Sequence, residues 1–126
     1  MLPLLKPQLD QYKKAGIVYR FTCPCGAVYI GETARELDIR IREHNQKSRN
    51  SEIYLHTTNC ETYQNSLPTT TTKIKSTFHF HFRTFFTIIR GNLFNYFERI
   101  CTESIYIILE NPSINRQKDF HALKIF

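Results

Sequence analysis

The 126-residue chain has four cysteines, and two of them are the close pair in Cys23-Pro24-Cys25. A disulfide within this pair would be sterically tight, so metal ligation is the better functional interpretation. The alternative is that these cysteines act as small apolar side chains. Met1–Lys6 lack the basic and apolar regions of a secretory signal, which favours a reducing compartment over a disulfide framework.

An arginine and a histidine are spaced so that they would share one face of a helix. Arg40 and His44 are four residues apart, so on a helix they project together from the border of the buried stripe. Taken singly, each has a plain structural explanation: Arg40 as a solvated helix charge and His44 as a helix-end residue. Their chemistry becomes informative only in combination with groups from other elements.

Two tyrosines occur in segments that are rich in β-branched and aromatic residues. Gly16–Phe21 and Ala27–Gly31 predict two strands, and Pro24 and Gly26 within residues 22–26 predict a turn between them. The result is an antiparallel hairpin. Alternation along strands puts Tyr19 and Tyr29 on the same face, and a loop of residues 22–26 places them opposite each other.

A helix is predicted to follow over residues 33–46. Thr33 and Glu36 fit a capping box, in which each side chain satisfies a backbone amide near the other. The inward stripe of this helix comprises Leu37, Ile41 and His44. A second, short helix is predicted from Ser51, as its N-cap, to about Thr58.

The second half of the chain continues the alternation of elements. Residues 61–77 include a threonine run and predict a flexible loop, and residues 77–89 begin with strict Phe/His alternation and predict a strand. A long helix is predicted over residues 93–109, ended by Asn111-Pro112. Its inward residues are predicted to be Leu93, Phe94, Phe97, Ile100, Cys101, Ile105 and Ile108.

This order of elements predicts an α/β (α+β) fold. A small three-stranded mixed or antiparallel sheet begins with the hairpin and is flanked by helices. Residues 1–15 are interpreted as a leader or the remnant of a longer chain, and residues 16–126 as a single domain. That length leaves room for one compact domain.

The charge of the chain favours a polyanionic partner. Lys and Arg number 17 against 11 Asp and Glu, which gives a formal net charge of +6. The excess lies in the first ninety residues. No window approaches the ~20 unbroken apolar residues of a membrane span, so no membrane partner is expected.

The spacing of the reactive residues carries a resemblance to a known family. Gly16-Ile17-Val18-Tyr19, then Tyr29-Ile30-Gly31, then Arg40-x-x-x-His44 on the next helix resembles a GIY-YIG nuclease domain. Farther on, the segment around Glu103 is similar to the family's glutamate-bearing helix, and that around Asn115 to its asparagine-bearing tail. The resemblance covers nearly the whole chain, with the order of motifs preserved.

A finer pattern is similar to the endonuclease domain of Penelope-like retroelements. It rests on Cys23-Pro24-Cys25 between the strand motifs, on the run Val28–Thr33, and on Asn111–Arg116. The resemblance implies a retroelement origin, with a reverse transcriptase region as a partner on a longer parent chain.

The resemblance assigns the polar groups that would act on a phosphodiester. Tyr19 would activate or orient the attacking water, for which a phenol with a pKa of about 10 needs a nearby positive charge or hydrogen bond. Arg40 would hold the scissile phosphate with its planar guanidinium. His44 would accept a hydrogen bond from a tyrosine or polarise it, and Tyr29 would position substrate or water.

The resemblance also implies one catalytic divalent cation. Glu103 would bind it, and Asn115 would organise the site through hydrogen bonds. Two-metal nucleases need several clustered carboxylates, whereas the acids of this chain are scattered. Mg²⁺, or Mn²⁺ in its place, suits a site made of one carboxylate, waters and phosphate oxygens.

A structural zinc site is implied by the same retroelement resemblance. The candidate ligands are Cys23, Cys25, His56 and Cys60, a donor set that suits tetrahedral Zn²⁺. The alternative is a hairpin turn with incidental cysteines. His79 and His81 are weaker candidate ligands, and we interpret them as sheet residues.

The leading hypothesis is therefore a metal-dependent DNA endonuclease that acts in the nucleus. One alternative is a catalytically decayed module that still binds nucleic acid through the same basic face. The other is a small zinc-stabilised structural domain. Cleavage, binding without cleavage, or neither would separate these three functions.

Overall fold

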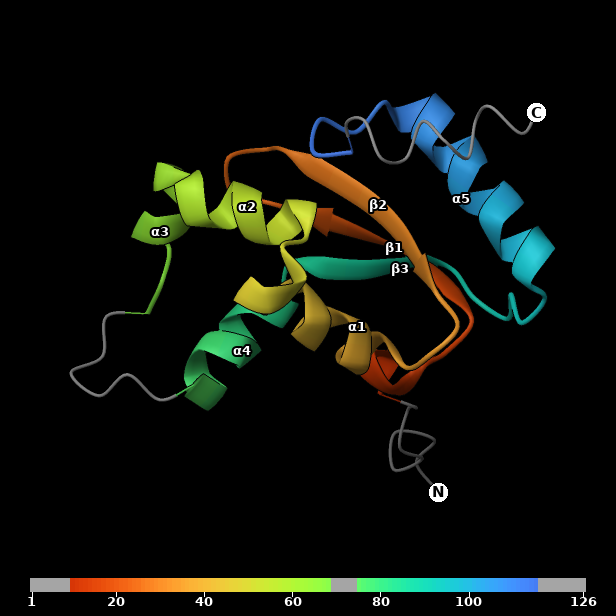
Figure 1. Ribbon diagram of the computed structural model, residues 1–126, viewed down its shortest axis with the longest axis horizontal. Helices are drawn as coiled ribbons and strands as arrows, with labels where there is room; N and C mark the ends of the chain where they lie inside the picture. The colour runs from red at the N-terminus through yellow and green to blue at the C-terminus, as the bar shows by residue number, and fades with distance from the viewer. Residues whose placement is uncertain (1–9, 69–74, 116–126) are drawn as a thin grey trace, which may run out of the picture.

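The computed structural model describes residues 10–68 and 75–115. A three-stranded antiparallel sheet in the order β2-β1-β3 forms its centre, with helices on both faces (Figure 1). The predicted fold class is confirmed. The elements in chain order are η2 (Gln11–Lys13), β1 (Ile17–Thr22), β2 (Val28–Thr33), α1 (Leu37–His44), η3 (Lys47–Arg49), α2 (Glu52–Asn59), α3 (Glu61–Asn65), α4 (Lys75–Arg83), β3 (Phe86–Arg90) and α5 (Tyr96–Glu110).

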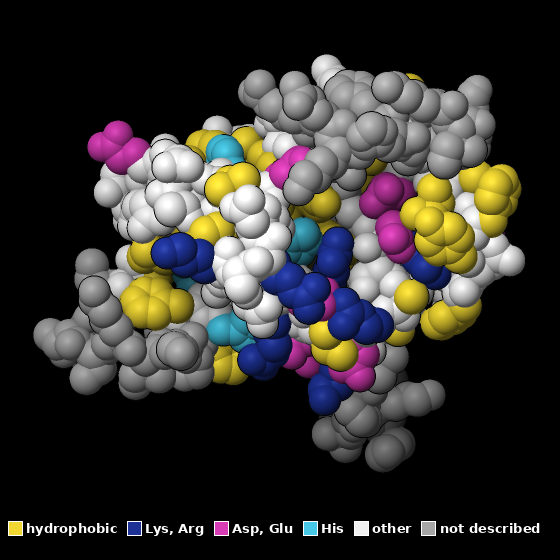
Figure 2. Space-filling model, viewed as in Figure 1, with side chains coloured by type: hydrophobic (Ala, Val, Ile, Leu, Met, Phe, Trp, Pro, Cys, Tyr) yellow, Lys and Arg dark blue, Asp and Glu magenta, His cyan; other side chains and the backbone are white. Residues whose placement is uncertain are grey.

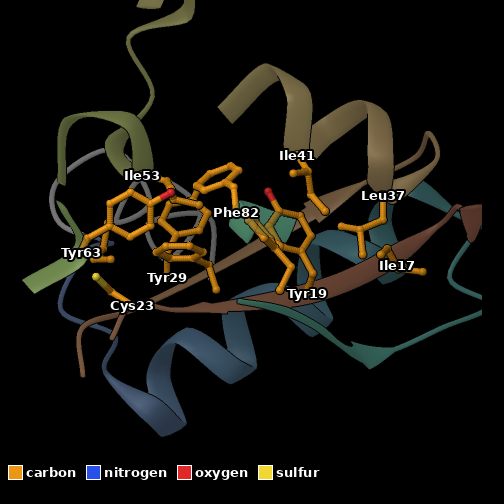
Figure 3. Packing of buried hydrophobic residues seen from close by; sticks show 12 residues of the cluster. Ile17, Tyr19, Cys23, Tyr29, Leu37, Ile41, Ile53, Tyr63 and Phe82 are labelled. Atoms are coloured by element: carbon orange, nitrogen blue, oxygen red, sulfur yellow. The ribbon is translucent and has the colours of Figure 1, made fainter. Parts of the chain in front are cut away.

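The central strand β1 divides the core into two layers. Its odd-numbered side chains pack with α1, α2 and α4, and Figure 3 shows Tyr19 on the same side of the sheet as Leu37 and Ile41 of α1. The even-numbered Val18 packs on the other face with Ile107 of α5. Because side chains alternate along a strand, the odd- and even-numbered residues of β1 pack into different layers.

The hairpin register is shifted by two residues from the prediction. Tyr19 lies opposite Gly31, and Phe21 lies opposite Tyr29. β1 runs one residue farther than predicted, to Thr22, whereas β2 begins one residue later, at Val28. The turn is closed by hydrogen bonds from the amide of Cys23 to the carbonyl of Ala27 (2.8 Å) and from the amide of Gly26 to the carbonyl of Cys23 (2.8 Å). The two tyrosines still share a face, because the register shift is two residues.

The first helix begins later than its apparent capping box. Thr33 is the last residue of β2, paired with Ile17, and its hydroxyl accepts from the amide of Arg35 (3.1 Å). Glu36 is the N-cap of α1 and makes no side-chain cap hydrogen bond. The capping-box prediction is wrong because strand pairing already occupies Thr33.

The short helix α2 follows the prediction. The Ser51 hydroxyl caps it by accepting from the amide of Tyr54 (3.1 Å). The loop predicted over residues 61–77 is wrong at both ends, where α3 and α4 lie, and the threonine run Thr69–Thr72 falls outside the described residues.

The strand predicted over residues 77–89 is wrong in its first half. Alternating Phe and His form α4, which buries Phe82 and leaves Phe80 exposed, and only Phe86–Arg90 joins the sheet. β1 has six residues, so it can pair with only part of the strand predicted over residues 77–89. Phe82 on α4 and Phe86 at the start of β3 both contact Phe21. The change from helix to strand between them lets both rings reach the same residue.

The last helix is turned the other way from the prediction. Its buried residues are Arg99, Glu103, Ser104 and Ile107. Four of the residues predicted to be inward are exposed: Phe94, Phe97, Ile105 and Ile108. Leu93, just before the helix, is buried as predicted. None of the described helices is long and apolar enough to cross a membrane.

The outer edge of β2 is covered by the segment that follows α5. The amide of Ile114 donates to the carbonyl of Val28 (2.9 Å), and the hydroxyl of Ser113 accepts from the amide of Val28 (3.3 Å). The Asn115 side chain then accepts from the amide of Ile30 (2.6 Å) and donates to its carbonyl (2.7 Å). This pairing satisfies edge groups that would otherwise be exposed.

Candidate active site

The phenol of Tyr19 is the meeting point of the candidate residues. Its oxygen lies 2.6 Å from Nε2 of His44 and 3.4 Å from Nε of Arg40, and its side chain is fully buried. The strand β1 supplies the tyrosine, and one face of α1 supplies both partners. The i, i+4 spacing of Arg40 and His44 therefore brings them together as the sequence predicts.

Gly31 creates the space into which the phenol extends. A Cβ atom at this position would lie 2.5 Å from the Tyr19 oxygen and 2.8 Å from the ring of Tyr29. Because Gly31 lies opposite Tyr19 on the edge strand β2, the phenol reaches the margin of the sheet. The glycine is thus required for close approach, not for an unusual backbone angle.

A chain of hydrogen bonds fixes the tautomer of His44. The Ser51 hydroxyl lies 3.1 Å from Nδ1 and 3.3 Å from the His44 carbonyl, to which it donates its single proton. We assign the ring proton to Nδ1, which donates to Ser51, so that Nε2 accepts from Tyr19. Burial, aided by the Arg40 charge, lowers the pKa of His44 to about 3. The imidazole is neutral at neutral pH.

Electrostatics keep Tyr19 protonated in this arrangement. Burial raises the pKa of the phenol above its ordinary value, and Arg40 opposes this rise through its charge and hydrogen bond. The negative charges of Glu103 and Glu32 raise the pKa further. A resting phenolate is therefore excluded, and the phenol donates to His44.

Tyr29 lies against the same group. Its ring centroid is 6.4 Å from that of Tyr19 and 5.4 Å from that of His44, the latter in an edge contact. Its side chain is 9% exposed, so it forms one wall of the site. Figure 3 shows Tyr19 and Tyr29 projecting from the same face of the sheet.

Glu103 reaches the site from the opposite layer. It lies on α5 and is 8% exposed, and its charge acts on the Tyr19 phenol. One turn earlier, Arg99 forms an ion pair with Glu32 of β2, which fixes this part of α5 against the edge strand. In Figure 2, Lys and Arg side chains gather over α1, and acidic side chains lie between them and α5.

The sequence of this chain also matches a known family of catalytic domains. The model of the GIY-YIG catalytic domain matches residues 15–118. The chain belongs to the GIY-YIG family. Comparisons with curated proteins and with solved structures gave no significant match. Because the GIY-YIG catalytic domain is a nuclease domain, membership implies phosphodiester hydrolysis and binding of nucleic acid.

In this GIY-YIG domain, the side-chain amide of Asn115 pairs with the edge strand β2. Both ends of its amide pair with the backbone of Ile30, as described above. It therefore fixes the edge strand that carries Tyr29 and Gly31.

The four candidate zinc ligands converge at the other end of the hairpin. Their ligand atoms all lie within 4.8 Å of one another. Cys23 and Cys25 come from the turn, His56 from α2, and Cys60 from the junction of α2 and α3. The Cys23 and Cys60 sulfurs are 3.8 Å apart, and the Cys25 sulfur is 3.3 Å from Nε2 of His56.

The two quoted distances are close to those around one tetrahedral ion. Bonds of about 2.3 Å to sulfur and about 2.0 Å to nitrogen place two sulfurs about 3.8 Å apart, and a sulfur and a nitrogen about 3.5 Å apart. The two weaker candidates take other partners: His79 pairs with Asp38 (3.0 Å) and His81 with Ser66 (3.2 Å). Both histidines lie on α4, so their interpretation as sheet residues is wrong.

Sequence reasoning missed Glu43 and its arginines. Glu43 is 7% exposed and accepts hydrogen bonds from Arg35 and Arg40. A signal was available, since Glu43 is three residues after Arg40 and faces the same side of a helix.

Replacing Gly31 with alanine tests the close approach of the phenol. We expect Gly31→Ala to displace Tyr19 from His44 and to lower the free energy of unfolding by about 1–3 kcal/mol, as overpacking does. Gly91→Ala is the matched control, because a Cβ there meets no atom within 4 Å. Equal stability of the two variants in urea denaturation would contradict this account.

The buried neutral imidazole predicts a stability that falls in acid. The pKa of His44 is about 3 in the folded chain, against an ordinary value of 6.5 for the unfolded chain. The unfolded chain therefore takes up a proton that the folded chain does not. Stability is then lost as the pH drops below about 6.5, by about 2 kcal/mol between pH 7 and pH 5. Urea denaturation should show a smaller loss for His44→Gln; an equal loss would refute the assignment.

Proposed function

We propose that this GIY-YIG domain is a divalent-metal-dependent DNA endonuclease. The observation that carries the proposal is the Tyr19 oxygen, which lies between Nε2 of His44 and Nε of Arg40 and within the field of Glu103. These residues come from the sheet, from α1 and from α5. Packing alone does not require a phenol, an imidazole, a guanidinium and a carboxylate to converge there.

Arg40 is placed to bind the scissile phosphate. Its side chain is 35% exposed while its Nε contacts Tyr19, so the guanidinium is open to a ligand on one side and fixed on the other. A phosphate bound there lies beside the phenol. Its negative charge would offset the Arg40 charge that lowers the pKa of His44 and so make the imidazole a better proton acceptor.

This arrangement supports a proton relay. Water attacks phosphorus and gives its proton to the Tyr19 oxygen while the phenol proton passes to Nε2 of His44. The bond from phosphorus to the leaving oxygen breaks as the new bond forms, and the leaving oxygen takes a proton from solvent water. No free phenolate is needed, in agreement with the raised pKa of Tyr19. Tyr29 would orient the water or substrate from its place beside both rings.

Glu103 fits the role of ligand to a catalytic cation. A single buried carboxylate at the margin of the site suits Mg²⁺, which keeps several waters and binds phosphate oxygens; Mn²⁺ could replace it. Such an ion would supply charge stabilisation to the leaving oxygen.

We further propose that the domain derives from a Penelope-like retroelement and acts in the nucleus. The support is the Cys-x-Cys turn between the two strand motifs and the convergence of its sulfurs with His56 and Cys60. In this proposal, a reverse transcriptase region on a parent chain is the functional partner, and zinc pins the hairpin turn to α2.

Cleavage of supercoiled plasmid DNA tests the nuclease proposal. We expect nicking or linearisation that needs Mg²⁺ and falls about 10²-fold or more in Tyr19→Phe, Arg40→Gln and Glu103→Gln. Tyr63→Phe is the matched control, since Tyr63 is a buried tyrosine at the other end of the core. DNA binding by a folded wild-type chain without cleavage would favour the decayed module instead.

Metal analysis tests the zinc proposal separately. We expect one zinc per chain by plasma emission spectroscopy, its loss in Cys60→Ser, and a lower melting temperature after chelation. Cys101→Ser is the matched control, because Cys101 lies on α5 outside the cluster. Equal zinc content in the two variants would refute the assigned ligand set.

A further inference from the structure

Glu43 is a buried carboxylate that gathers three arginines beside the candidate active site. Its side chain is 8% exposed. Nη2 of Arg35 lies 2.6 and 2.5 Å from its two oxygens, Nη1 of Arg40 lies 3.2 Å from one of them, and Nη2 of Arg49 lies 3.3 Å from the other. We name these four residues the arginine cluster.

The three arginines come from separate segments. Arg35 precedes α1, Arg40 lies within it, and Arg49 ends η3 after it. Their side chains are 55%, 35% and 59% exposed, respectively. One buried carboxylate thus fixes three guanidiniums that remain open to solvent, and the cluster keeps a net positive charge.

Arg40 belongs both to this cluster and to the candidate active site. Its Nε faces the Tyr19 oxygen and its Nη1 faces Glu43. A strand whose scissile phosphate lies at Arg40 therefore has the other two guanidiniums beside its path. In Figure 2, dark blue side chains gather on this face over α1.

We propose that Arg35 and Arg49 bind backbone phosphates of the DNA strand next to the scissile phosphate, and that Glu43 is the positioning residue that holds all three guanidiniums. This inference rests on the proposed function, because it takes the phosphate at Arg40 as its reference point. Arginine suits the task, since its planar fork keeps donors free for a phosphate while it binds a carboxylate.

The carboxylate makes the cluster more than a basic surface. Free arginine side chains lose rotamer entropy when they bind, whereas guanidiniums already held by Glu43 lose less. Hydrogen bonds from Arg35 lower the pKa of Glu43 below its ordinary value, so the anchor stays ionised at neutral pH. The alternative is a set of stabilising ion pairs with no ligand.

The salt dependence of DNA binding separates these two explanations. Anisotropy of a short fluorescein-labelled duplex is measured in EDTA over a range of salt concentrations, so that no cleavage occurs. We expect Arg35→Gln and Arg49→Gln each to weaken binding and to reduce the slope of log K against log salt by about 1. Arg90→Gln, which removes an exposed charge on β3, is the matched control.

The positioning role of Glu43 is tested by Glu43→Gln. We expect a lower kcat because Arg40 loses its anchor, with little change in DNA binding because the lost preorganisation of Arg35 and Arg49 opposes the gain from removing a negative charge. A merely structural role would lower the melting temperature and leave kcat of the folded protein unchanged, which would overturn the positioning assignment.

The two proposals fail in different ways. Slopes for Arg35→Gln and Arg49→Gln equal to that of Arg90→Gln would overturn the phosphate sites, even if plasmid cleavage is observed. Reduced slopes would support them even if the wild-type chain cuts no DNA, in which case only the nuclease proposal fails.

Discussion

The hydrogen bond between the buried phenol of Tyr19 and the neutral imidazole of His44 constrains the whole site. It joins the central strand to α1 across the core, and it forms only because Gly31 leaves room for the phenol on the neighbouring strand. Ser51, the cap of α2, holds the far side of the imidazole. A buried polar pair is tolerated here because the Tyr19 oxygen, both ring nitrogens of His44 and the Ser51 hydroxyl all have hydrogen-bond partners.

The same constraint explains why the acid and the rings can come from opposite layers. Tyr19 is on the central strand, but its phenol passes over Gly31 to the edge of the sheet. Glu103 lies on α5 against the other face of the sheet, and its charge raises the pKa of the phenol. Asn115 pairs with the same edge strand and fixes it. In the proposed nuclease, the margin of β2 is therefore where groups from the two layers would act on one phosphate.

Local patterns in the sequence predicted what depends on local geometry. The hairpin, the i, i+4 placement of Arg40 and His44, and the cap at Ser51 follow from the periodicity and hydrogen bonding of single elements. The start of α1 and the nature of α4 did not, since they depend on which strand residues find partners. Likewise, Arg35 and Arg49 meet at Glu43 only after the turns around α1 have formed.

The orientation of α5 shows how the site overrides the hydrophobic pattern. Apolar residues such as Phe97 and Ile108 form a clear stripe, yet they face outward at 65% and 63% exposure. The opposite stripe faces the sheet, where Arg99 pairs with Glu32 of β2 and Glu103 is buried. Turning the helix to bury the apolar stripe would break the ion pair of Arg99 with Glu32 and expose Glu103. The apolar pattern alone therefore points the wrong way, because polar contacts favour the other orientation.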